Sequence, residues 1–302
     1  MKELAERIEA LKKEKDAVIL AHYYVDGAVQ EIADYVGDSY YLSKVATQSK
    51  NKTIILCGVK FMGESAKILN PDKLVILPDA TADCPMAHMV TPTEILAKRQ
   101  EFPDLSVVCY INSTAEIKAV SDVCVTSSNA LEIVKALPTK NIFFVPDRNL
   151  GGYIASLLPE KHFIFNNGFC YVHDEITKES IEEVLSRYPL AKVLVHPECR
   201  DSVTAVADYV GSTSGIIDFA TKSGASDFII ATEEGILHAL MQKNPNKRFH
   251  FPDKRPVCLD MKKITLEKIE HALMTLENQV QLEEDLAAKA EKALRKMHEI
   301  AG

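Results

Sequence analysis

Three stretches of this sequence share one pattern and decide its fold: VILAHYY (18–24), SVVCYINS (106–113) and KVLVHPEC (192–199). Each is an apolar run of strand length that ends in polar residues. Each is followed at a matching distance by a short hydroxyl-bearing motif: GDS (37–39), TSS (126–128) and STS (212–214). Self-similarity at a fixed period is the signature of an internal repeat. The pattern therefore predicts one β/α unit that is used three times.

The spacing between equivalent residues supports this repeat. The hydroxyl column, separated by 88 and 86 residues, is Ser39, Ser127 and Thr213. The cysteine column, separated by 86 and 88 residues, is Cys84, Cys170 and Cys258. Shifts of 88 and 86 give two strand-end columns: His22, Tyr110 and His196, then Tyr24, Asn112 and Glu198. We expect each unit to supply two polar residues after a strand, one hydroxyl and one cysteine.

The rest of the chain alternates helical stretches with strand-like runs, which are Ala17–Ala21, Thr53–Val59, Leu74–Leu77, Leu105–Tyr110, Asn141–Val145, His162–Phe165, Ala191–Val195 and Asp227–Ala231. This alternation is typical of parallel α/β sheets. We predict an α/β fold of three similar αβα domains, related by a pseudo-threefold axis around a central active site. The expected domains are 1–86 with an N-terminal helix, 87–172, 173–262, and a closing segment of one or two helices at 263–302.

Composition and charge exclude several function classes. The 302 residues carry a net charge of −8 and form no basic stripe, so neither nucleic acid nor an anionic membrane is an expected partner. The longest apolar runs fall far short of the roughly 20 residues that span a bilayer. The first residues, MKELAERIEALKKEKD, are charged and amphipathic, unlike a signal peptide. We expect a cytoplasmic protein.

Seven cysteines, an odd number in a reducing compartment, do not suggest a disulfide framework. No Cys-x-x-Cys pair is present among them, which disfavours a closed zinc site. Three thiolates could hold an iron–sulfur cluster with one open, Lewis-acidic iron. The competing interpretation is that the three repeated cysteines are buried structural thiols. Three other cysteines lie in or beside apolar runs and are expected in the core: Cys57, Cys109 and Cys124.

The polar columns also have two interpretations. Ligands of open α/β sheets bind beyond the carboxyl ends of the strands, where the histidines, tyrosines and Glu198 are expected and could transfer protons. Ordinary strand-end polar residues would look the same. The hydroxyl residues fit the N-cap preference, and three helix N-termini facing one cavity would bind an anion. His173, three residues after Cys170, is a second-tier candidate.

An ordered set of motifs covers essentially the whole chain: AHYY, IADYVGDS, CYINS, CVTSSNA, VPDRNLGGYIA, NGFCYVHDEIT, HPEC, GSTSGII and CLDMKKIT. In this set the sequence resembles the quinolinate synthase family, the A protein of NAD biosynthesis. The resemblance implies condensation of iminoaspartate with dihydroxyacetone phosphate to quinolinate, with loss of phosphate and two waters. No redox change is needed, so the family's 4Fe–4S cluster acts as a Lewis acid.

The resemblance also assigns roles to individual residues. It implies cluster ligation by Cys84, Cys170 and Cys258. It implies a catalytic cavity lined by His22, Tyr24, Tyr110, Asn112, His196 and Glu198, of which all but Tyr24 also bind substrate. It implies binding of phosphate or carboxylate groups by Ser39, Ser127 and Thr213. The instability of iminoaspartate in water further suggests a transient contact with L-aspartate oxidase.

Two departures from the family pattern stand out: Tyr23 occupies a position where many members have Asn, and the segment after Cys258 lacks the extra Cys-x-x-Cys of longer members. Neither touches an expected ligand. Two alternatives remain at the level of sequence. One is another iron–sulfur hydro-lyase with a different acid substrate, and the other is a non-catalytic anion-binding protein with buried thiols.

Overall fold

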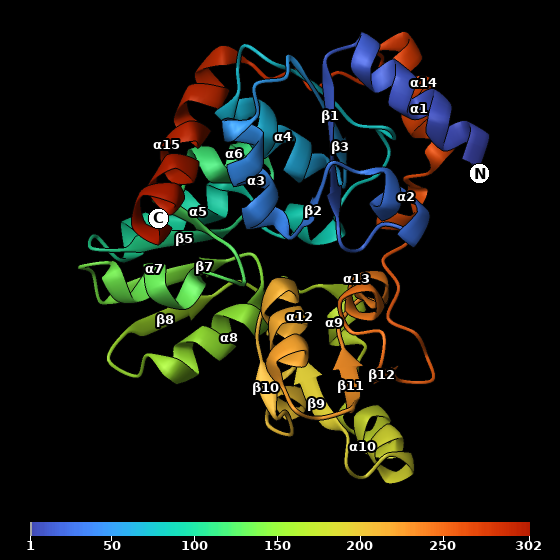
Figure 1. Ribbon diagram of the computed structural model, residues 1–302. Helices are drawn as coiled ribbons and strands as arrows, with labels where there is room; N and C mark the ends of the chain where they lie inside the picture. Colours follow the sequence, from blue (N-terminus) through green and yellow to red (C-terminus); the bar gives the residue numbers. More distant parts are fainter. Residues whose placement is uncertain (1) are drawn as a thin grey trace.

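The computed structural model describes residues 2–302, and within that range it contains three four-stranded sheets in which every strand pair is parallel (Figure 1). Their strand orders are β2-β1-β3-β4, β6-β5-β7-β8 and β10-β9-β11-β12. The second and third orders are the first with every strand number raised by four and by eight. This identity confirms the predicted α/β class with three similar αβα units.

The units match element by element. The first contains α1 (Lys2–Glu14), β1 (Ala17–His22), α2 (Gly27–Ile32), β2 (Tyr35–Gly37), α3 (Ser39–Gln48), β3 (Thr53–Cys57), α4 (Lys60–Leu69), β4 (Leu74–Ile76) and the 3₁₀ helix η1 (Pro85–His88). The second contains α5 (Pro92–Glu101), β5 (Ser106–Tyr110), α6 (Ala115–Ala119), β6 (Val123–Val125), α7 (Ala130–Ala136), β7 (Asn141–Val145), α8 (Arg148–Leu157), β8 (His162–Phe165) and α9 (Tyr171–Asp174).

The third unit repeats this order with α10 (Lys178–Arg187), β9 (Lys192–Val195), α11 (Asp201–Thr204), β10 (Tyr209–Val210), α12 (Thr213–Lys222), β11 (Asp227–Ala231), α13 (Ile236–Lys243), β12 (Arg248–His250) and the 3₁₀ helix η2 (Met261–Lys263). The chain closes with α14 (Leu266–Thr275) and α15 (Glu284–Ala301). Each unit therefore ends in a short helical turn just after one of the repeated cysteines. The domain boundaries inferred from the sequence remain a proposal.

Each unit also fixes the start of its central strand in the same way. A carboxylate accepts a hydrogen bond from a strand N–H, and the backbone N–H of the same acidic residue donates to that strand residue's carbonyl. The three pairs are Asp34 with Ile19, Asp122 with Val107 and Asp208 with Val193. The acidic residues are again 88 and 86 apart. With the strand starts fixed alike, the opposite, carboxyl ends of the strands present equivalent positions.

Four short strands are not predicted by the sequence: β2, β6, β10 and β12. They are two or three residues long and lie at sheet edges. A run this short contains too few residues to show a strand's alternation. The predicted strands agree with the structure to within two residues at either end, as when the expected run Thr53–Val59 ends at Cys57.

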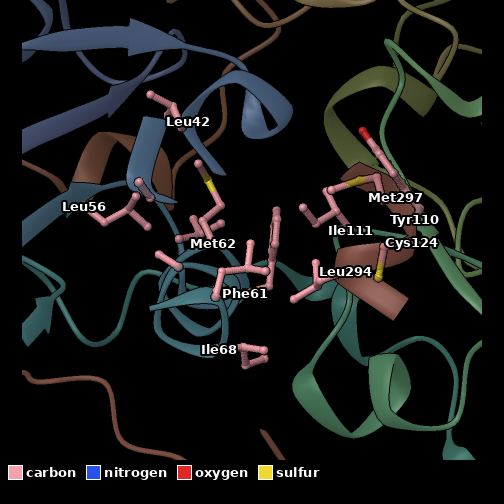
Figure 2. Packing of buried hydrophobic residues seen from close by; sticks show 14 of the residues in the cluster. Leu42, Leu56, Phe61, Met62, Ile68, Tyr110, Ile111, Cys124, Leu294 and Met297 are labelled. Atoms are coloured by element: carbon pink, nitrogen blue, oxygen red, sulfur yellow. The ribbon is translucent and has the colours of Figure 1, made fainter. Parts of the chain in front are cut away.

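The C-terminal helices close the fold over the first two units. α14 packs on α1, and α15 packs across α6 and α4 (Figure 1). Figure 2 shows Leu294 and Met297 of α15 beside Ile111 and Cys124 of the second unit, within one cluster that also includes Phe61 of the first. In the region from Lys2 to Gly302, no helix is long and apolar enough to cross a membrane.

Candidate active site

One chamber is lined by all twelve residues of the four repeated columns. It lies at the carboxyl ends of the central strands, because β1 ends at His22, β5 ends at Tyr110, and His196 directly follows β9. The chamber has a cavity volume of about 70 Å³. One water needs roughly 10–15 Å³, so the chamber has room for several water-sized groups. The roles of these residues remain predictions.

His22 and His196 have the same local hydrogen-bonding arrangement, each in its own unit. His22 Nδ1 accepts a hydrogen bond from the Tyr24 N–H at 3.2 Å, and His196 Nδ1 accepts one from the Glu198 N–H at 3.3 Å. Burial lowers the pKa of His22 and of His196 to about 3. Both rings are therefore neutral at pH 7, with the proton on Nε2. From that nitrogen His196 reaches Ser127 Oγ, 3.2 Å away.

The hydroxyl column lines the chamber, but the alternative explanation that these residues are helix N-caps is wrong. Ser39 and Thr213 are the first residues of α3 and α12, and their helices are capped by Asp38 and Ser212. Asp is as good a cap as Ser, and the run at 212–214 offers adjacent hydroxyls of which the first is used. Ser127 lies in a turn before α7, whose N-cap position is Asn129.

A hydrogen-bonded chain of side chains crosses the site. The Tyr24 hydroxyl is 2.9 Å from Thr232 Oγ1, which is 2.8 Å from His173 Nε2. On the other side of this ring, His173 Nδ1 is 2.7 Å from Glu198 Oε2. His173 was a second-tier candidate, and Thr232 was missed because its counterparts in the other units, Gly58 and Pro146, are not polar. The chain could carry a proton between a carboxylate and a phenol.

The charges in the chamber are set by burial and by this pairing. Burial alone would raise the pKa of Glu198, but the adjacent His173, through its charge and hydrogen bond, lowers it to about 2. Glu198 is therefore ionised, and its Oε1 is a buried oxygen without a hydrogen-bond partner in the part of the chain that the structure describes. Burial, followed by the charge of Glu198, raises the pKa of Tyr24 and Tyr110, so both phenols stay protonated.

The three repeated cysteines line the chamber as free thiols. Burial raises the pKa of each, and in each case a backbone N–H three residues further along acts in the opposite direction, at Ala87, His173 and Met261. Three convergent sulfurs, each facing an N–H that favours a thiolate, fit a metal–sulfur group that leaves one metal position open. The core cysteines, Cys57, Cys109 and Cys124, are fully buried, as predicted.

A second set of ligand atoms overlaps with the first. Cys170, His173 and Glu198 each offer one ligand atom, and these atoms lie within 4.8 Å of one another. This group could hold a metal ion. Because Cys170 belongs to both sets and Glu198 and His173 line the chamber, any metal group bound by the three thiols would be near a carboxylate and an imidazole.

Fold and site together define a class: an internally triplicated α/β protein in which each unit contributes one thiol and several polar groups to a single buried chamber. A family model described as Quinolinate synthetase A protein matches residues 6–299. The chain belongs to this family.

Curated relatives agree over full length. A protein named quinolinate synthase from Fusobacterium nucleatum is 55% identical over 299 residues, which is 99% of this chain and 100% of the relative. One of the same name from Clostridioides difficile is 52% identical over 300 residues and 99% of both chains. A third, from Caldicellulosiruptor saccharolyticus, is 48% identical over 301 residues, 100% of this chain and 99% of the relative.

Proposed function

We propose that this chain is a quinolinate synthase of NAD biosynthesis, which condenses iminoaspartate with dihydroxyacetone phosphate and releases phosphate and two waters. The observation that carries the proposal is the convergence of three thiols and nine polar side chains, drawn from all three units, on one chamber. Family membership supports the same activity. We further propose a cytoplasmic location and only a transient contact with L-aspartate oxidase.

In this proposal Cys84, Cys170 and Cys258 hold a 4Fe–4S cluster, which when bound supplies a Lewis-acidic iron. Ser39 and Thr213 stand at the first positions of two ten-residue helices, where backbone N–H groups favour an anion. Ser127, Asn112 and the neutral imidazoles add hydrogen bonds without adding charge. These residues would bind and orient the phosphate and the carboxylates.

Proton transfer falls to Glu198 and the side chains connected to it. Within the described residues, the ionised carboxylate has one oxygen without a hydrogen-bond partner and one oxygen bound to His173. It would accept a proton from the substrate. That proton would move through His173 and Thr232 to Tyr24 as the Tyr24 hydroxyl releases its own proton to a leaving group of the substrate. Tyr110, kept protonated beside Glu198, would donate a hydrogen bond to a substrate oxygen. Glu198, His173, Thr232 and Tyr110 are buried, which would limit the access of bulk water to the unstable imine.

The test is an anaerobic assay of the purified protein, reconstituted with iron and sulfide, for quinolinate formation from the two substrates. We expect a brown protein that forms quinolinate. A brown protein that dehydrates simple hydroxy acids but makes no quinolinate would instead be another hydro-lyase. A colourless protein that binds phosphate compounds without turnover would be the non-catalytic alternative.

A further inference from the structure

We propose that Asp147 and Glu233 are positioning residues, which fix the backbone of two of the three chamber cysteines through carboxylate oxygens, and that Asp83 does the same for the third. The cysteines' use as cluster ligands rests on the proposed function. The geometry of the carboxylates does not rest on the proposed function. The position shared by Asp147 and Glu233 is a further repeated position, which the four sequence columns do not include.

The first observation is a backbone hydrogen bond that occurs once in each unit. The three bonds run from Lys60 N–H to the Ala82 carbonyl at 2.9 Å, from Arg148 N–H to Gly168 at 2.8 Å and from Glu234 N–H to Pro256 at 2.8 Å. Donors and acceptors are each separated by the repeat spacing, and every acceptor lies two residues before a chamber cysteine. Each cysteine loop is thus docked on the loop that follows the third strand of its unit.

The second observation concerns the residue just before each donor, which is Val59, Asp147 or Glu233. In the second and third units this residue is a carboxylate with no exposed surface. Glu233 Oε1 accepts from the Cys258 N–H at 3.1 Å, and Oε2 accepts from the Gly235 N–H at 2.7 Å. Oε1 is also 3.1 Å from Lys262 Nζ. One oxygen thus contacts both the cysteine amide and Lys262, while the other holds the loop on which the cysteine loop is docked.

Asp147 occupies the equivalent position in the second unit. Its Oδ1 accepts from the N–H groups of Asn149 and Leu150 at 2.8 and 3.0 Å, which caps α8. The Cys170 N–H lies close enough to this carboxyl group to counteract the rise in pKa that burial causes there, but it forms no hydrogen bond with it. Oδ2 is buried and has no hydrogen-bond partner within residues 2–302. Helix capping therefore accounts for the hydrogen bonds of Oδ1, while Oδ2 remains available to the cysteine loop.

The first unit has Val59 at this position, and a different residue, Asp83, binds the cysteine amide there. Asp83 Oδ1 accepts from the Cys84 N–H at 2.7 Å, and Oδ2 is 2.9 Å from His88 Nε2. The Asp83 side chain is 35% exposed, whereas the other two carboxylates are fully buried. The amides of Cys84 and Cys258 thus donate to a carboxylate, and the amide of Cys170 lies near one. Asp147 and Glu233 share a repeat position, whereas Asp83 does not.

A buried carboxylate is costly unless it is well bonded. Its presence at the same position of two units is explained if it fixes where each cysteine points. Groups that orient metal ligands from outside typically account for 10- to 100-fold in metal affinity. An amide side chain has only one acceptor oxygen, so Asp147→Asn can still cap α8 but cannot also serve Cys170. Glu233→Gln must likewise give up either Cys258 or Gly235.

The experiment compares Asp147→Asn and Glu233→Gln with Glu64→Gln. Glu64 is also buried and accepts one backbone N–H, from Ala115 at 3.0 Å, away from the cysteines. Amide hydrogen exchange at Cys170 and Cys258 is measured in the metal-free chain. After anaerobic reconstitution, the rate of iron loss to a chelator is measured on the same proteins.

We expect exchange to rise about tenfold at the cysteine of the altered unit only, and iron loss to accelerate about 10-fold or more. Glu64→Gln should match the unaltered protein in both. The proposal is overturned if Asp147→Asn and Glu233→Gln behave like Glu64→Gln. Should either variant fail to fold, the exposed pair decides: Asp83→Ala must speed exchange at Cys84, and Asp253→Ala must not.

The two readouts separate this proposal from the proposed function. If the unaltered protein takes up no cluster, the function is wrong, while hydrogen exchange in the metal-free chain still tests the carboxylates. If the cluster and quinolinate formation are present but exchange at the cysteines is unchanged in both variants, only the positioning proposal fails.

Discussion

The first two units share one continuous hydrophobic core, whereas the third unit has cores of its own. The large core joins buried residues of the first two units to α14 and α15, and Met261 of η2 is its one buried member from the third unit among the described residues. Figure 2 shows the part of this core around Phe61, Ile111 and Leu294. The third unit has one core on each face of its sheet, and within residues 2–302 the only buried residue that another unit adds to these cores is Tyr23. Three units with the same topology are thus packed in two different ways.

The third unit joins the other two largely through polar contacts around the chamber. The Tyr24 hydroxyl is 2.9 Å from Thr213, His196 reaches Ser127, and Ser214 Oγ donates to Asp38 Oδ2 at 2.6 Å. Hydrogen bonds contribute about 1 kcal/mol each on balance, less than a buried large apolar side chain. The three units therefore contribute equal numbers of repeated residues to the chamber, whereas apolar packing joins the first two units more strongly than it joins the third.

The largest expected effect tests the even sharing of chemistry. Changing Cys84, Cys170 or Cys258 to Ser should abolish cluster binding and quinolinate formation to the same extent, because each unit supplies one of three ligands. Iron content and activity are the measurements. Cys124→Ser, in the large core, is the control. Loss of iron in that variant with retention in Cys84→Ser would show that the ligands are assigned wrongly.

The next effect tests the fused core. Leu294→Ala on α15 removes a fully buried side chain at the junction of the first two units. We expect about 3 kcal/mol lower free energy of unfolding, measured by denaturant titration. Hydrogen exchange should rise in α4 and α6 and stay unchanged in α12. The exposed neighbour Lys292→Ala should change stability by less than about 0.5 kcal/mol.

Glu198 tests the boundary between the two regions, because it belongs to the third unit and faces Tyr110 of the second. Glu198→Gln keeps the shape and removes the ionisable group. We expect roughly 10²-fold lower turnover with intact iron content and stability. Ser127→Ala and Thr213→Ala should instead weaken binding of a phosphate-bearing substrate analogue first. Near-normal turnover of Glu198→Gln would direct the search for the base to Tyr24, Tyr110 and His196.

The repeat columns could be predicted because each marks a position that the fold itself repeats. Residues at a strand's carboxyl end reach the chamber in every unit, so spacing alone brought His22, Tyr110 and His196 together. The carboxylates Asp34, Asp122 and Asp208 follow the same spacing and could have been found in this way. Asp147 and Glu233 could not be found so directly, because Val59 interrupts their column.

Other features depend on what the units do not share. Thr232 completes the hydrogen-bonded chain in one unit only, so no repeat identifies it, and its role depends on the distance to His173. The unequal cores are equally hidden, since the three sheets have similar apolar strands. The cores differ because α15 covers the first two units. The amphipathic pattern of a terminal helix predicts which face is buried but not which units that face packs against.

The smallest expected effect concerns Tyr23, which inserts from the first unit into a core of the third and is 8% exposed. We expect Tyr23→Asn to fold while losing apolar contact with α12 and α13. We expect about 1–2 kcal/mol lower stability, with faster hydrogen exchange confined to those helices. Turnover should change only a few-fold, because the ring does not line the chamber. The exposed Tyr35→Asn is the control. If Tyr23→Asn raised hydrogen exchange in α4 and α6 as much as in α12, the third unit would not be packed separately. The contrast between the shared core of the first two units and the polar contacts of the third would then be wrong.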